Sequence, residues 1–215
     1  MAILKVGGTQ IASSSGSDGT LDNVALGSSV TGLPSAGFKH LATVTAADTA
    51  VAASFDGFYT SYYTHYTVMW HDVKCTHNNA GMQFRVRQSN ADLATGSGYH
   101  HISDGRNYDT ADAASYNQSQ DYSKIGATDS ASSATYKHSG ELTLYAPLTS
   151  GTIKYMGGHT MGYNSAGPPT AFRSYRTGIW YVGNTNALSG FSFYFDQTTA
   201  NTISGTFQLF GIKNS

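Results

Sequence analysis

The residues best suited to chemistry in this chain are its histidines and its single cysteine. The sequence contains eight histidines, and the densest group of possible metal ligands is His65, His71, Cys75 and His77. Ligands two or four residues apart in a β-strand lie about 7–14 Å apart, too far to share one ion unless the backbone bends. His100 and His101 are adjacent, so a strand would turn them to opposite faces. We therefore predict no structural metal and no cofactor, with these histidines at a surface or an interface.

No spacing of nucleophile, base or carboxylate marks a catalytic centre. Glu141 is the only glutamate among 13 acidic residues, whereas a glycosidase needs two carboxylates across one cleft. Linear order favours no particular aspartate as its partner. The sequence contains no phosphate loop, dinucleotide fingerprint or nucleophile elbow, and nothing beside Cys75 marks a depressed thiol pKa. We predict a protein that is not an enzyme and has no catalytic residues.

A tyrosine-rich segment, residues 58–66, offers two interpretations. Its sequence, FYTSYYTHY, could form an aromatic platform on which carbohydrate rings stack. The alternative is a strand with half-buried or interface aromatics, which we favour because Tyr59, Tyr62, Tyr63 and Tyr66 cannot all share one face.

Composition excludes several classes of partner. Charged residues make up 12% of the chain and the net charge is −1, with no run of either sign, so no basic stripe for nucleic acid is present. The arginine pairs Arg85/Arg87 and Arg173/Arg176 are expected to lie on solvated strand faces. No apolar stretch reaches transmembrane length and no long apolar segment marks a secretory signal, so we expect neither membrane nor nucleic-acid binding. With one cysteine the fold needs no oxidising compartment, and we expect synthesis in a cytoplasm.

Alternating apolar and polar residues predict an all-β protein. The 15 tyrosines, 10 phenylalanines and 24 glycines fit strands and turns better than helices. We predict about eight or nine strands, at residues 41–45, 51–55, 62–75, 82–88, 141–144, 153–161, 172–182, 191–195 and 203–212. A turn is expected at Ala47-Asp48 and another at residues 167–169. This pattern is typical of an antiparallel β-sandwich, and a jelly roll is the version we expect.

The faces of these strands follow from the same alternation. In residues 62–75 we place Tyr66 and Trp70 on one face and Val73 on the other. The last strand changes phase between Leu209 and Phe210, which suggests a bulge or burial on both faces. The predicted core residues are Phe84, Val86, Leu142, Leu144, Phe191, Phe193 and Phe207.

Two segments depart from the alternating pattern. Residues 89–138 contain few large aliphatic side chains, and we treat them as a long insertion with a short strand at 99–102 and one helical turn at 111–116. Residues 1–37 are rich in Gly and Ser, with small apolar groups that cannot form a core unaided. The expected domains are thus an extended arm, 1–37, and a sandwich, 38–215. The arm is either a frayed terminus or a partner-binding segment; in the second case its contact residues are Ile3, Leu4, Val6, Leu21, Val24 and Leu26.

The carboxyl-terminal segment resembles a known family. Residues 188–195, LSGFSFYF, a polar turn and residues 203–213, ISGTFQLFGIK, resemble the closing hairpin of small jelly-roll modules in tailed-bacteriophage virion structural proteins. Residues 58–73 resemble the early long strand of those modules, residues 83–88 the next and residues 140–147 a middle one. The resemblance extends over residues 38–215 and is anchored at its two ends, while residues 89–138 match nothing in it.

The resemblance implies a non-enzymatic module on a phage particle, commonly a homotrimer. Such modules are capsid decoration (cement) proteins, head fibres or tips of tail fibres, and they bring no catalytic residues to carry over. We expect a virion protein made in the host cytoplasm that coats the outer capsid surface, with itself and the major capsid protein or other virion proteins as partners. The alternative is a short tail fibre or receptor-binding protein that contacts a host glycan or protein. A third candidate is a jelly-roll carbohydrate-binding protein or carbohydrate-active enzyme.

Overall fold

The computed structural model describes residues 2–6, 9–14, 37–76, 80–94, 98–107, 113–125, 137–163, 172–195 and 202–213. The chain divides into two compact units, Met1–Ser35 and Ala36–Ser215. All regular elements of the described residues are strands: β1 Ala2–Val6, β2 Thr9–Ser14, β3 Gly37–Ala50, β4 Ala53–Asp56, β5 His65–Cys75, β6 Met82–Gln88, β7 Ala91–Asp92, β8 Tyr99–Asn107, β9 Ala113–Gln120, β10 Ser123–Lys124, β11 His138–Tyr145, β12 Lys154–Tyr163, β13 Phe172–Tyr181, β14 Gly190–Phe195 and β15 Ile203–Lys213.

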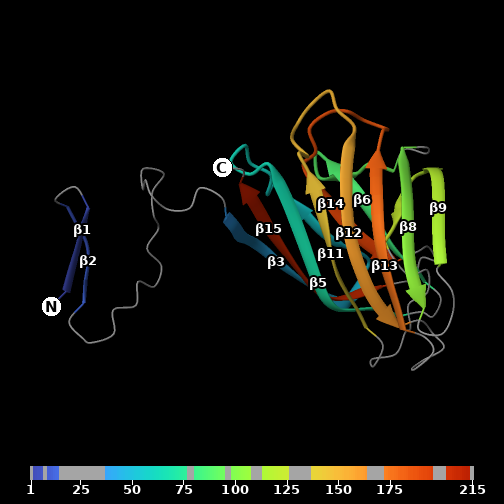
Figure 1. Ribbon diagram of the computed structural model, residues 1–215, viewed down its shortest axis with the longest axis horizontal. Helices are drawn as coiled ribbons and strands as arrows, with labels where there is room; N and C mark the ends of the chain where they lie inside the picture. Colours follow the sequence, from blue (N-terminus) through green and yellow to red (C-terminus); the bar gives the residue numbers. More distant parts are fainter. Residues whose placement is uncertain are drawn as a thin grey trace. The chain divides into compact units, whose positions relative to one another are not determined.

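The second unit is an antiparallel β-sandwich, which confirms the predicted all-β sandwich, while the jelly-roll topology stays a prediction. Its larger sheet has eight strands in the order β3-β15-β5-β11-β12-β13-β8-β9, which Figure 1 shows side by side. The smaller sheet has the order β10-β6-β14-β4, and β7 pairs with β6. Every strand pairing in both sheets is antiparallel. No helix of the described residues is long and apolar enough to cross a membrane.

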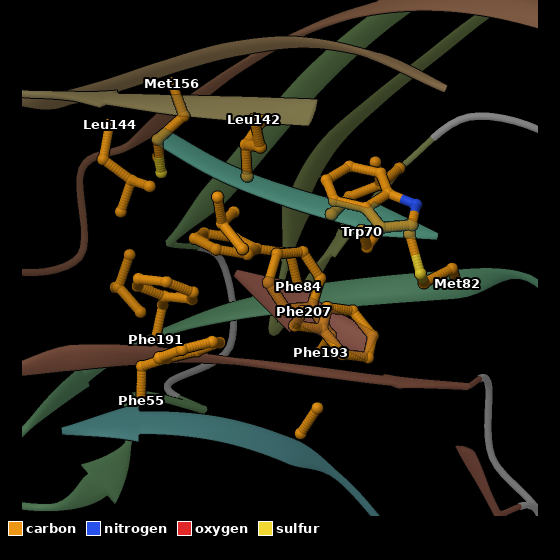
Figure 2. Packing of buried hydrophobic residues seen from close by; sticks show 14 of the residues in the cluster. Phe55, Trp70, Met82, Phe84, Leu142, Leu144, Met156, Phe191, Phe193 and Phe207 are labelled. Carbon is orange, nitrogen blue, oxygen red and sulfur yellow. The ribbon is translucent and has the colours of Figure 1, made fainter. Parts of the chain in front are cut away.

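The core lies between the two sheets. Leu142, Leu144 and Met156 point from the larger sheet toward Phe55 and Phe191 of the smaller one (Figure 2). All seven predicted core residues are at most 1% exposed, so this prediction is confirmed. Strand alternation identified them because every second side chain of a strand faces the opposing sheet.

A β-bulge changes the phase of β5, and the predicted face of Val73 is therefore wrong. The register with β15 shifts between Ser204 and Thr206, opposite Asp72. Asp72 adopts a left-handed backbone with φ of 59°, and Gly205 has φ of 135°. Val73 consequently points into the core, fully buried, on the same side as Trp70. A bulge inserts one unpaired residue and so exchanges the faces beyond it.

The segment 89–138 forms strands where the sequence suggested mostly loop. β8 continues to Asn107, well beyond the expected short strand, and pairs with β13 along its whole length. The helical turn predicted at 111–116 is wrong, because β9 runs through these residues from Ala113 and pairs with β8. Tyr99 is fully buried, and its hydroxyl donates to the Leu93 carbonyl and accepts from the Val86 amide. The small residues of this segment are compatible with strands because packing and pairing with neighbours, rather than intrinsic propensity, decide strand formation.

Two boundaries near the start of the sandwich also differ from expectation. The predicted turn at Ala47-Asp48 does not form, because β3 continues to Ala50 and pairs with β15. β5 begins at His65, and Tyr62 lies in a turn before it. The expected turn at 167–169 lies outside the described residues.

The first unit contains an antiparallel hairpin. β1 pairs with β2 from Ala2↔Ser14 to Val6↔Thr9. Ile3, Leu4 and Val6 of the predicted contact set belong to β1. The remaining three, Leu21, Val24 and Leu26, lie outside the described residues.

Candidate functional site

The outer face of the smaller sheet is occupied by an internal ion-pair network. Arg87 on β6 donates to Asp56 Oδ1 at 2.9 Å and to Asp92 Oδ1 at 2.6 Å. Arg85 donates to Asp121 Oδ2 at 3.1 Å and lies 4.6 Å from the centre of the Tyr194 ring. Both guanidinium side chains are only 15–16% exposed, so the predicted solvated face is wrong for this arginine pair. These two guanidinium groups and three carboxylates pair with one another and leave little for a ligand to bind.

The outer face of the larger sheet carries an exposed aromatic row instead. Cross-strand pairing places Tyr145, Tyr155, Trp180 and His100 side by side on β11, β12, β13 and β8. Tyr145 is 47% and Tyr155 57% exposed. The His100 and Trp180 rings stack with centroids 5.3 Å apart. Residues that neighbour one another across strands form this row, although they span more than 80 positions in sequence.

A pocket of about 440 Å³ opens on the same face over β8, β12 and β13. It is lined by Asp104, Gly105, Arg106, His159, Ser174 and Arg176. His159 Nε2 and Ser174 Oγ are 2.8 Å apart and form a hydrogen bond. Arg176 is the cross-strand partner of both His159 and Asp104. In the described part of the chain no ion pair engages Arg176 or Asp104, so both side chains are available to a ligand.

Two glycines separate the pocket from the aromatic row. Gly157 and Gly178 are cross-strand partners on β12 and β13. A Cβ at Gly157 would meet no atom closer than 3.8 Å, and one at Gly178 none closer than 3.5 Å. Sheet packing therefore does not require glycine at either position. Their effect is to leave a low floor between the aromatic and the charged side chains, with the Tyr145 ring beside Gly157 and the Ile102 side chain beside Gly178.

The possible metal ligands considered in the sequence are not brought together. His71 is exposed, whereas Cys75 is buried beyond the Asp72 bulge. His77 lies outside the described residues. Among the residues that the structure describes, no group of three or more His, Cys, Asp or Glu side chains could hold a metal ion. Glu141 is exposed on the outer face as the cross-strand partner of His159.

The tyrosine-rich segment has a structural role in part. The Tyr66 ring is fully buried, and its hydroxyl accepts from the Thr60 amide at 2.7 Å and donates to the Thr60 carbonyl at 2.9 Å. Tyr59 packs against Tyr66 with ring centroids 4.6 Å apart. Tyr62 is 58% exposed, with the Lys213 ammonium 4.6 Å from its ring centre. These tyrosines do not share one face, so the segment forms no continuous platform.

Two histidines are buried. The expectation of a surface or interface position is therefore wrong for His101, and His138 was not singled out by the sequence. His101 on β8 is fully buried, and within the described structure neither ring nitrogen has a hydrogen-bond partner. His138 on β11 is 2% exposed, and its Nε2 likewise lacks a partner there. Burial, which disfavours the charged ring, lowers the pKa of each from 6.5 to about 4. Alternation with exposed Glu141 was the available signal for the inward direction of His138, whereas at His101 the apolar neighbour Ile102, which is 52% exposed, pointed to the opposite assignment.

No protein family model, curated protein or solved structure matches this chain. The site is thus defined by the chain's own residues. It combines the Arg176 guanidinium, which no ion pair engages among the described residues, with hydroxyl and carboxylate acceptors and exposed aromatic rings on a wide antiparallel sheet.

Proposed function

We propose that this protein is a non-enzymatic bacteriophage virion structural protein, and specifically a decoration protein that coats the outer capsid surface as an oligomer. The observation that carries the proposal is the open edge of the larger sheet. β3 has 14 residues and pairs only with β15 among the described strands, so one side of its backbone is unpaired there. Such an edge is a template for adding a strand from another protein.

The central part of this edge lies between two irregularities in its register with β15, at residues 40–42 and 46–50, and it lacks the charges and prolines that prevent strand addition. Residues 41–47, LATVTAA, contain no charge and no proline. The edge strands of the smaller sheet are far shorter, with four residues in β4 and two in β10. Natural sheets protect edges by short strands, lysines, prolines or bulges, so the uncharged stretch between the two irregularities is expected to be covered in an assembly.

An aromatic corner adjoins the same edge. Phe38 on β3 is 51% exposed and stacks on Phe210 of β15 with centroids 4.7 Å apart. Aromatic side chains contribute strongly to protein interfaces because they bury a large area at little cost in conformational entropy. Together with the resemblance of the closing hairpin, Ile203–Lys213 included, to phage jelly-roll modules, this corner supports a subunit or capsid contact.

The test is decoration of capsids that lack this protein. A double variant, Thr43→Lys and Thr45→Lys, places two charges on exposed positions of the β3 edge. We expect the wild type to saturate capsids at several hundred copies and the variant to lose at least about tenfold in affinity, the equivalent of roughly 1.4 kcal/mol. The control is Ser150→Lys with Asn186→Lys, two exposed positions in loops away from this edge.

Two results would count against the proposal. If the wild type leaves capsids undecorated and binds host cells, the tail-fibre alternative replaces it. If the lysine variant decorates as fully as the control, the β3 edge is not the contact. Turnover of a polysaccharide that disappears on mutating Glu141 would contradict the non-enzymatic assignment.

A receptor-binding role is the second candidate, and the pocket over β8, β12 and β13 favours it. Arg176 and His159 line a cavity beside exposed aromatic rings, which is an arrangement suited to a small polar ligand. Copy number distinguishes the two roles, because a tail protein is present in a few tens of copies at most.

A further inference from the structure

The pocket on the outer face of the larger sheet contains an arginine that no ion pair engages in the described structure. Arg176 lines this pocket together with Asp104 and His159. Arg176 lies beside Asp104 across the strands, yet the two form no ion pair in the described structure. An unpaired guanidinium presents a planar fork of donors that matches a carboxylate.

Arg176 differs from the arginines of the smaller sheet in that its guanidinium is available to a ligand. There, Arg85 and Arg87 are both held by aspartates within hydrogen-bond distance and are largely buried. Arg176, on the other sheet, is exposed and has no such partner among the described residues. Its positive charge is therefore a feature of the pocket and not of an internal network.

The surroundings of the pocket fit a sugar. Asp104 and the His159–Ser174 pair offer acceptors and donors for hydroxyl groups. Alternate residues of a strand are about 7 Å apart, so the Gly157–Gly178 floor gives room for one pyranose ring between the pocket and the aromatic row. Exposed Tyr155 stands at the far side of this floor, where its ring can contact the apolar face of a sugar.

We propose that this surface binds a carboxylate-bearing saccharide, with the acid group on Arg176, hydroxyl groups on Asp104, and a pyranose ring across the Gly157–Gly178 floor against Tyr155. The inference goes beyond the proposed capsid role and does not rest on it, because β12, β13 and β8 lie in the opposite half of the sheet from β3. A nucleic acid is a poor fit, since the net charge is −1 and Glu141 and Asp104 lie on the same face.

The test uses the full chain and a pair of ligands that differ only in the acid. Calorimetric titration with an oligouronate trimer is compared with titration of the same trimer after reduction of its carboxyl groups. We expect saturable binding of the uronate and at least about tenfold weaker binding of the reduced sugar, because a charge-assisted hydrogen bond contributes about that much. Inorganic phosphate and sulfate are titrated in parallel and should not compete at equal concentration.

Three variants locate the site. Arg176→Gln removes the guanidinium, Gly157→Val fills the floor, and Tyr155→Ala removes the stacking ring; each should weaken uronate binding at least about fivefold to tenfold. Gly157→Val is expected to fold because a Cβ there meets only ordinary contacts. The control, Lys39→Gln, removes an exposed positive charge from β3 and should bind as the wild type does.

Several outcomes would overturn the proposal. These are absence of saturable uronate binding to the wild type, equal binding of the reduced sugar, and equal competition by phosphate, which would show an anion site only. Unchanged affinity of Arg176→Gln or of Tyr155→Ala for the uronate would also refute the proposal. Both of these variants change exposed side chains, so they keep the test valid if Gly157→Val fails to fold. A negative result here leaves capsid decoration untouched, since that assay measures a different surface.

Discussion

Acid should destabilise this protein through two buried histidines. In the folded chain burial holds His101 and His138 neutral, with pKa values lowered from 6.5 to about 4, and the Lys124 charge adds to the effect at His101. In the unfolded chain both rings are free to accept protons. Because the folded pKa is the lower one, the contribution of each ring to stability is complete above pH 6.5. It is lost progressively as the pH falls from 6.5 toward 4.

The magnitude follows from the two pKa values. A shift of one pKa unit corresponds to about 1.4 kcal/mol. Between pH 7.5 and pH 5, each ring should lower the free energy of unfolding by about 2 kcal/mol, or by about 4 kcal/mol for the pair. The range stops at pH 5 because carboxylates titrate below it. Hydrogen bonds from Ser204 and Lys74 lower the pKa of Asp48 below 3.8, and one from Lys137 does the same for Asp72.

The perturbation is replacement of both rings by leucine, which is apolar and of similar volume. Urea unfolding at pH 7.5, 6 and 5 gives the free energy of unfolding of the wild type and of the His101→Leu/His138→Leu variant. We expect the wild type to lose about 4 kcal/mol more than the variant over this range. The control is His40→Gln, which removes an exposed histidine and should show the same pH dependence of the free energy of unfolding as the wild type. Parallel pH dependence of the wild type and the double variant would refute the assignment of these two rings as buried and neutral.

Three further predictions concern the free energy of unfolding, and each cost below is a decrease in this free energy, measured through the change in unfolding midpoint. Phe193→Ala should cost about 3–5 kcal/mol because this fully buried ring packs against four other aromatic rings, whereas Phe38→Ala at an exposed position should cost far less. Gly205→Ala should cost about 1–3 kcal/mol because its φ is 135° and a Cβ would lie 2.7 Å from a neighbouring methyl carbon; Gly37→Ala, in open space, is the control. Arg87→Met should cost about 1–3 kcal/mol by leaving two half-buried carboxylates unpaired, and a near-neutral result would show that the network is dispensable.

Metal content gives a separate check. Elemental analysis of the purified chain is expected to find no stoichiometric zinc, because ligands spaced along one strand lie too far apart to share an ion. A molar equivalent of zinc that survives dialysis would contradict this prediction and would point to ligands outside the described residues, His77 among them.

The residues of the candidate site could not be grouped from the sequence alone. Asp104, His159 and Arg176 come from strands far apart in the chain, and only the register of β12, β13 and β8 places them in one pocket. Glu141 was considered as a catalytic group, but its neighbour His159 could not be known without that register. Residues 89–138 had the weakest pattern, and they supply half of the pocket's lining.

The sequence by itself determined the fold class and the core. Alternation in Met82–Gln88, Gly190–Phe195 and His138–Tyr145 identified the buried faces because the period of a strand is a local property of the backbone. Tertiary structure decided the direction of Val73 and the strand character of Ala113–Gln120. A bulge depends on the partner strand opposite it, and a strand of small residues is stabilised mainly by pairing with its neighbours. Both are long-range interactions, which no local pattern records.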